Sequence, residues 1–178
     1  TLLEEKSSSA QYANPRWSPD GKYIALSVKP DGSLRELLLL SVGDGRKTRI
    51  RKPGCRLRDP EWSPDGKALY FSSDCSGVSE IYSCQLKRKA CHKITRTGSG
   101  FFKPAASPDG NSIAALSYEG SGGTVALFPL PGPRAWTPVS FVFEEDPHRA
   151  PVAPNPDPTP ESGSKYQPLP GLFIPRLL

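Results

Sequence analysis

The sequence predicts an all-β fold built from a unit that recurs three times along the chain. The phrase Ser-Pro-Asp-Gly occurs at residues 18–21, 63–66 and 107–110, and a period of about 40–45 residues is typical of repeat architectures. The 178 residues include 21 prolines and 16 glycines, a composition that favours short strands and turns over long helices. Because each unit contains four strand-like segments joined by turns, we predict a partial β-propeller of about three four-stranded antiparallel blades with a proline-rich C-terminal tail.

The repeated phrase has the chemistry of a tight turn between two strands. Proline suits the second position of a type I turn, aspartate bonds its own backbone, and glycine accepts the left-handed conformation that closes the hairpin. We expect the aspartates to hold the turn rather than to perform catalysis, because they recur with it. The structural turn residues are Pro19, Asp20, Gly21, Pro64, Asp65, Gly66, Pro108, Asp109 and Gly110.

The first blade is expected at residues 14–53, after a leader, or the end of a preceding blade, at residues 1–13. Turn-forming residues separate its four segments, which lie at 15–18, 22–28, 36–42 and 46–51. The second blade, residues 54–100, repeats the pattern with segments at 60–63, 67–72, 80–86 and 91–95. The third, residues 101–139, has segments at 104–107, 112–116, 124–130 and 135–139.

The second segments of the three units are nearly continuous apolar runs (IAL, LYF and IAAL). Such runs are typical of strands that are buried on both faces, as the middle strands of a propeller blade are. Trp17 and Trp62 stand at equivalent positions just before the repeated turn. We interpret both tryptophans as core or inter-blade packing.

The composition changes at about residue 140. Six prolines lie between residues 147 and 160 with few apolar neighbours, so the stretch at 140–178 is expected to be an extended linker. The apolar residues at 166–176 then look like the lead-in to a further domain.

The repeat resembles the TolB-like, WD-repeat-like (PD-repeat) propeller family, whose unit reads approximately P-x-W-S-P-D-G-x-x-[IL]-x-[FL]. Residues 14–26 and 59–71 match almost throughout, and 103–116 match without the tryptophan. Propellers of this kind serve as periplasmic binding modules, as gates of prolyl-oligopeptidase-like peptidases, and as accessory domains of outer-membrane proteins. Their rings usually hold about six to eight blades, so three blades imply an open arc that adjacent blades complete.

Residues 134–139, the proline-rich spacer and residues 166–176 resemble the junction in a bacterial surface-antigen family, where a TolB-like propeller precedes a BamA-like outer-membrane β-barrel. This resemblance implies a non-enzymatic, protein-binding scaffold on the periplasmic side of an outer-membrane protein, with an unidentified protein partner. The alternative is the substrate-gating propeller of a prolyl-oligopeptidase-like serine peptidase whose catalytic domain lies outside this sequence. Barrel strands after Leu178 would favour the first, and a GxSxG motif the second.

All four cysteines lie in the second unit. Cys55 and Cys75 occupy two loops at one end of the predicted blade, whereas Cys84 and Cys91 face each other across a hairpin at the other end. We predict these two disulfides, which need Cα separations of about 4.4–6.8 Å and fit an oxidising compartment such as the periplasm. Four free thiols are the alternative, and a zinc site is disfavoured because no CxxC pair is present.

The familiar catalytic motifs are absent from the sequence: it contains no GxSxG, no Walker-type Gly-Lys-Ser/Thr and no HExxH. A nucleophilic pair of Cys91 and His92 is disfavoured, because adjacent strand residues point to opposite faces. A calcium site from Asp31, Asp44 and Asp74 lacks the ligand spacing of an EF-hand loop. We therefore predict no enzyme activity and no catalytic, cofactor-binding or metal-binding residues.

The net charge of +5 is unevenly distributed, since residues 46–103 hold fourteen Lys or Arg against five Asp or Glu. An anionic partner such as nucleic acid or lipid headgroups is one reading of this excess. The basic residues are not interleaved with stacking aromatics, so we expect solvated strands and loops and no nucleic-acid partner. No signal-peptide pattern opens the chain, and the longest aliphatic run, residues 37–40, is far shorter than a membrane-spanning helix of about 20 residues.

Overall fold

The computed structural model of the chain describes residues 10–119, 122–130 and 137–146, which form three antiparallel sheets and no helices. We call the sheets blades one, two and three. Blade one contains β1 (Gln11–Trp17), β2 (Tyr23–Lys29), β3 (Glu36–Ser41) and β4 (Lys47–Arg51). Blade two contains β5 (Leu57–Trp62), β6 (Ala68–Ser73), β7 (Glu80–Gln85) and β8 (Ala90–Lys93). Blade three contains β9 (Phe101–Ala106), β10 (Ser112–Glu119) and β11 (Gly122–Pro129).

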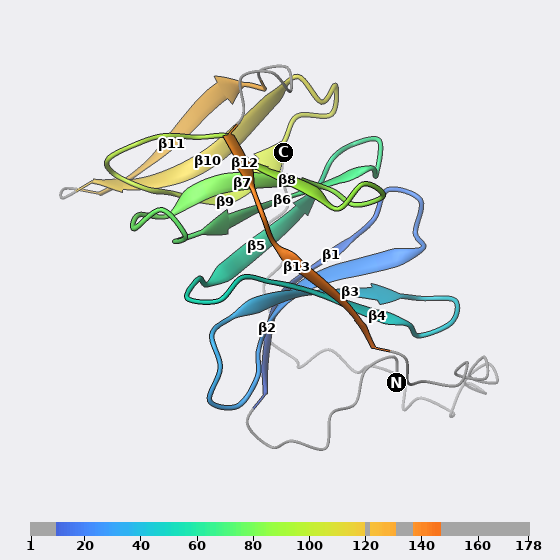
Figure 1. Cartoon of the computed structure of the whole chain (residues 1–178). Coiled ribbons are helices and arrows are strands. Elements are labelled where there is room, and N and C mark those ends of the chain that lie inside the picture. The colour runs from blue at the N-terminus through green and yellow to red at the C-terminus, as the bar shows by residue number, and fades with distance from the viewer. Residues whose placement is uncertain (1–9, 120–121, 131–136, 147–178) are drawn as a thin grey trace, which may run out of the picture.

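Successive blades lie side by side, with neighbouring strands of each blade joined as antiparallel hairpins (Figure 1). Strand β5 contacts β1 on one side and β9 on the other, so the first strands of the three blades are neighbours. This arrangement confirms the predicted all-β, partial β-propeller fold.

Each first strand carries a β-bulge at the same repeat position. The backbone φ angles there are 55°, 52° and 48°, and the residues are Asn14, Asp59 and Lys103. The register of the adjacent ladder shifts at the bulge. Each bulged residue precedes a proline, which has no N–H to donate to the ladder. The bulge therefore lies where the strand could not have paired regularly.

The two larger clusters of the hydrophobic core lie between the blades. From β6, Leu69 and Phe71 pack in the cluster shared with blade one, whereas Tyr70 packs in the cluster shared with blade three. Adjacent strand residues point to opposite faces, so a strand between two blades is buried on both faces and is mostly apolar. All six residues of β6 are buried, which confirms the interpretation of the continuous apolar runs.

The two tryptophans before the turns differ in burial. Trp62 is only 6% exposed and packs in the core between blades one and two, as expected, but Trp17 is 59% exposed. Trp62 lies against blade one and donates its indole N–H to the carbonyl of Arg16 at 3.0 Å. Within the described residues no blade precedes blade one, so Trp17 has no such neighbour. The prediction that Trp17 packs in the core or between blades is wrong for the described part of the chain.

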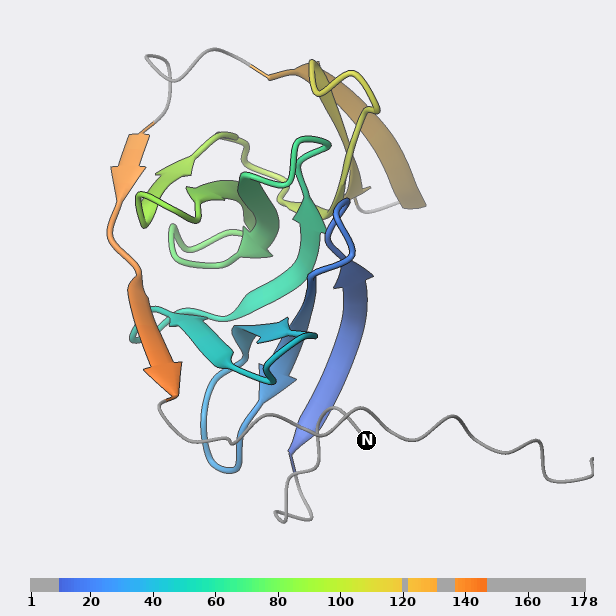
Figure 2. The same cartoon turned by 90° about the vertical axis from the view of Figure 1, so that its right-hand side faces the viewer.

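After blade three the chain returns along the outer edges of the other two blades (Figure 2). Strand β12 (Thr137–Val139) pairs with β8 of blade two, and β13 (Val142–Asp146) pairs with β4 of blade one. We call residues 137–146 the strap. The prediction that residues 135–139 form the fourth strand of blade three is therefore wrong for β12, which belongs to the sheet of blade two. The prediction that residues 140–178 form an extended linker is wrong for β13, because this strand pairs with β4.

Other boundaries differ less. Strand β1 begins at Gln11, inside the predicted leader, because its first residues pair with the end of β2. The proline-rich stretch at 147–178, with the predicted lead-in at 166–176, lies outside the described residues. The blade boundaries at residues 53, 100 and 139 stay predictions. Across the described residues, no helix has the length and hydropathy needed to cross a membrane.

Candidate binding groove

The three Ser-Pro-Asp-Gly turns share one hydrogen-bond pattern, which the second copy illustrates. The N–H of Gly66 donates to the carbonyl of Ser63 at 2.9 Å, and the φ of Gly66 is 69°. The Ser63 hydroxyl donates to Asp65 Oδ1 at 2.7 Å and accepts from the N–H of Ala68 at 2.9 Å. Asp65 Oδ1 also accepts from the N–H of Lys67 at 3.1 Å. Serine, aspartate and glycine each therefore make a bond that the turn requires.

The same bonds recur in the first and third copies. Two hydrogen bonds hold the pKa of the aspartate below its usual value in each turn, at Asp20, Asp65 and Asp109. The larger effect comes from the serine hydroxyl, and the second from the backbone N–H two residues after the aspartate. The three carboxylates are thus used within their own turns. The geometry fits the structural role predicted for the repeated phrase.

Turns of neighbouring blades also lie close to each other. A Cβ built on Gly66 would lie 3.7 Å from Cδ of Pro19, and one built on Gly110 would lie 3.8 Å from Cδ of Pro64. The turns therefore form a row along one end of the blades.

A groove of about 820 Å³ opens beside this row, between blades one and two. Its apolar wall is formed by Tyr23, Leu39, Trp62, Leu86 and Phe143. Tyr23 is 41% exposed, and the centroid of its ring lies 6.4 Å from that of Trp62. The groove thus presents aromatic and aliphatic surface in a hollow large enough for a small ligand or a few residues of a peptide.

The rim of the groove is mainly basic. Lys67 pairs with Asp65 at 3.2 Å and Lys89 with Glu145 at 3.3 Å. Lys87 and Arg88 also line the groove, and among the described residues neither has a carboxylate within ion-pair distance. These two cations come from the β7–β8 hairpin, which places positive charge directly beside the apolar wall.

The strap closes the outer side of the groove. Phe143 and Glu145 of β13 line it, and the ring of Phe141 lies edge-on to Phe71 at 5.4 Å and to Tyr82 at 5.7 Å. Sequence reasoning missed these residues because they fell in the predicted linker. The signal that could have found them is the run Phe-Val-Phe at 141–143, because aromatic and β-branched residues are enriched in strands.

Both predicted cysteine pairs are joined by disulfides, and none of the four thiols is free. The Cα separation is 4.9 Å for Cys55 and Cys75, and 4.0 Å for Cys84 and Cys91, slightly below the expected range. Cys84 and Cys91 are direct partners in the β7–β8 ladder, which brings their backbones close. The Cys91 sulfur is bonded, so it is not the nucleophile of a pair with His92.

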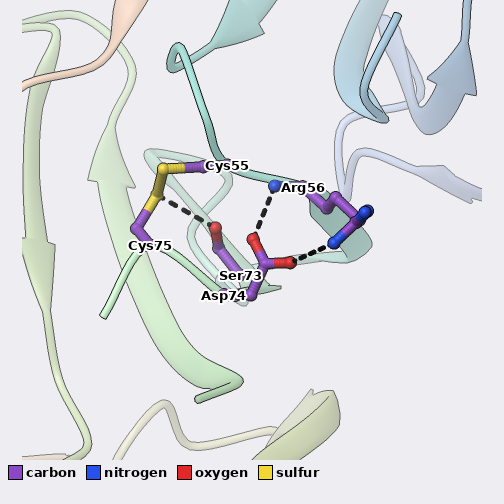
Figure 3. A network of polar contacts seen from close by, with 5 residues as sticks. All are labelled: Cys55, Arg56, Ser73, Asp74 and Cys75. Atoms are coloured by element: carbon purple, nitrogen blue, oxygen red, sulfur yellow. Dashed lines mark hydrogen bonds and ion pairs between the residues drawn. A yellow bond between two sulfur atoms is a disulfide. The ribbon is translucent and has the colours of Figure 1, made fainter. Parts of the chain in front are cut away.

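The Cys55–Cys75 bridge fixes two loops at the end of blade two opposite the turns (Figure 3). Next to it, the Asp74 carboxylate accepts from the Arg56 N–H at 2.7 Å and from Arg56 Nη1 at 3.1 Å, and Ser73 Oγ donates to Cys75 Sγ at 3.2 Å. Two of the aspartates considered for calcium are thus held by arginines, since Asp44 pairs with Arg46. The described residues bring together no group of three or more His, Cys, Asp or Glu suited to a metal ion.

Comparisons with known proteins agree with this architecture. The family model described as the TolB beta propeller domain matches residues 4–155. No curated protein matches the chain. A solved structure of a TolB from Agrobacterium tumefaciens is 23% identical with a TM-score of 0.62, covering 79% of this chain and 52% of that one.

Two further solved structures are similar. TolB from Acinetobacter baumannii is 26% identical, with a TM-score of 0.57, and the match covers 66% of this chain and 29% of that one. An oligogalacturonate lyase in complex with manganese is 18% identical, with a TM-score of 0.53, and the match covers 72% of this chain and 38% of that one. The chain therefore spans about half, or less, of the length of these three structures.

Proposed function

Because the chain belongs to the TolB β-propeller domain family, we propose that it is a non-enzymatic, protein-binding module of the periplasm and part of an outer-membrane-associated protein. Two disulfides support an oxidising compartment. The outer-membrane association rests on the resemblance of residues 134–139 and 166–176 to a propeller-to-barrel junction. The observation that carries the binding role is the groove between blades one and two, with its apolar wall and basic rim.

The groove favours an extended acidic segment of a partner protein that carries an aromatic or leucine anchor. Tyr23, Leu86 and Phe143 would bury the anchor, since a few large side chains in desolvated pockets carry most of the free energy of binding at protein interfaces. Lys87 and Arg88, which have no carboxylate partner among the described residues, would pair with acidic residues beside the anchor. Charge complementarity of this kind steers association and selects the partner.

The test is binding of the chain to an array of short synthetic peptides that vary independently in acidic and apolar content. We expect the bound peptides to combine Asp or Glu with a Trp, Phe or Leu. In solution, Arg88→Gln should weaken binding of the best peptide by about tenfold, measured by fluorescence anisotropy, because it removes an ion pair at the edge of an apolar pocket.

Lys103→Gln is the matched control, because it removes the same charge from an exposed residue of β9 that does not line the groove. Equal losses in Arg88→Gln and Lys103→Gln would show general charge attraction and contradict the groove as the binding site. Hydrolysis of a proline-containing peptide by the full-length protein would contradict the non-enzymatic part of the proposal.

A further inference from the structure

A second cavity, of about 780 Å³, lies at the opposite end of blades one and two, away from the row of turns. Four cationic side chains line it: Lys29, Arg35, Arg56 and Arg58. Lys29 ends β2 and Arg35 precedes β3, whereas Arg56 precedes β5 and Arg58 is its second residue. The cations converge because the β2–β3 connection of blade one and the entry to blade two meet at this end.

Among the described residues, one of the four cations is paired with a carboxylate and three are not. Asp59 is the one carboxylate among the described lining residues. Its Oδ1 accepts from Asn14 Nδ2 at 2.7 Å and its Oδ2 accepts from Ser72 Oγ at 2.9 Å, so both oxygens already have partners. Asp74 pairs with Arg56. Within the described ranges, no carboxylate lies within ion-pair distance of Lys29, Arg35 or Arg58.

Arg35 carries an unsatisfied donor next to the cavity. Its Nη1 atom is buried and has no hydrogen-bond partner, although buried polar atoms are normally satisfied. The Arg35 carbonyl accepts from the N–H of Leu57 at 2.8 Å, which anchors this residue of blade one to the first strand of blade two. The backbone of Arg35 is thus fixed, and its guanidinium has an unused N–H that is suited to bind an oxygen of an anion.

We propose that this cavity binds a small multivalent oxyanion, a molecule that carries two or more carboxylate or phosphate groups. Arg35 and Arg58, both half-buried, would each bind one anionic group through their planar forks. The volume lies within the range of small-molecule sites, about 300–1,000 Å³. The Cys55–Cys75 disulfide and the Arg56–Asp74 pair fix the loop on which the site depends, so it is formed before the ligand arrives.

Isothermal titration calorimetry of the chain with sodium pyrophosphate and with tricarballylate tests the proposal at physiological ionic strength. We expect saturable binding of at least one of the two anions with one site per chain. Preference for pyrophosphate assigns phosphate ligands, and preference for tricarballylate assigns carboxylates. Arg35→Gln and Arg58→Gln should each weaken binding by about tenfold or more. Arg58→Lys, which keeps the charge but loses the fork, should retain part of the affinity.

Lys103→Gln serves as the control of equal charge change, at the repeat position that corresponds to Asp59 but away from the cavity. Each variant is compared after its circular dichroism spectrum and melting temperature match those of the parent chain. Absence of saturable binding for both anions, or equal affinity in Arg58→Gln and Lys103→Gln, would overturn the proposal. Arg58→Gln should leave peptide binding in the groove unchanged, so the two sites are tested separately.

Discussion

The serine of each repeated turn is the residue on which the end of the blade depends. Its carbonyl accepts a hydrogen bond from the glycine N–H. Its hydroxyl donates to the aspartate and accepts from the backbone N–H of the residue five positions later. All these bonds join residues within a span of six. This is why the turns could be predicted from four letters of sequence, whereas contacts between distant segments could not.

The aspartates of these turns predict acid sensitivity. Their pKa values are lowered in the folded chain by the serine hydroxyl and a backbone N–H. A carboxyl whose folded pKa lies below its unfolded value stabilises the fold at neutral pH, and this contribution is lost as pH falls from about 4 through the folded pKa. We expect urea titrations to show a decline in the free energy of unfolding over this range.

The triple variant Asp20→Asn, Asp65→Asn and Asp109→Asn isolates this effect, because asparagine still accepts hydrogen bonds but does not titrate in this range. Its free energy of unfolding should fall less steeply below about pH 4 than that of the parent chain. The same slope in both proteins would show that other groups cause the acid sensitivity.

At the scale of elements, the strands of each blade were predictable and their neighbours were less so. Apolar runs identified β2 and β6, because a strand that is buried on both faces has apolar residues at consecutive positions. Trp17 and Trp62 have similar local sequences but different burial, since that depends on whether another blade lies alongside. The strap pairs Val142 with Arg51, a partner about 90 residues away, and no local pattern encodes such a contact.

The strap is expected to stabilise the pair of blades that it crosses. Phe141 lies edge-on to Phe71 and Tyr82, and Glu144 pairs with Arg51 of β4. Phe141→Ala should lower the free energy of unfolding by about 2 kcal/mol, because it removes partly buried aromatic contacts. Val142→Ala is the control from the next residue along, whose side chain is 42% exposed. Equal effects in urea denaturation would mean that the Phe141 contacts do not hold the strap.

At the scale of the whole molecule, positions one repeat apart bond across the seam between blades one and two. Asn14 donates to Asp59 at 2.7 Å, and Arg16 pairs with Glu61 at 3.2 Å. The repeat of 45 residues therefore brings equivalent positions side by side. The candidate groove and the cationic cavity lie at opposite ends of this seam, and neither could be located before the seam was known.

The two disulfides should contribute unequally to the stability of the molecule. Cys55–Cys75 spans 20 residues and Cys84–Cys91 spans 7, so loop-closure entropy assigns them about 3 and about 2 kcal/mol respectively. Replacing both cysteines of the first pair by serine should lower the melting temperature more than the same change in the second. The reverse order would contradict this account, and four alkylatable thiols in the unreduced protein would exclude both bridges.

The most direct test of the central claim, that a partner segment binds in the groove between blades one and two, is hydrogen–deuterium exchange with and without the best peptide from the array. The account predicts slower exchange in three places: around Trp62, in the β7–β8 hairpin and in the strap. It predicts no change in the β2–β3 connection at the opposite end. Protection confined to that connection, or to β9–β11 of blade three, would contradict it.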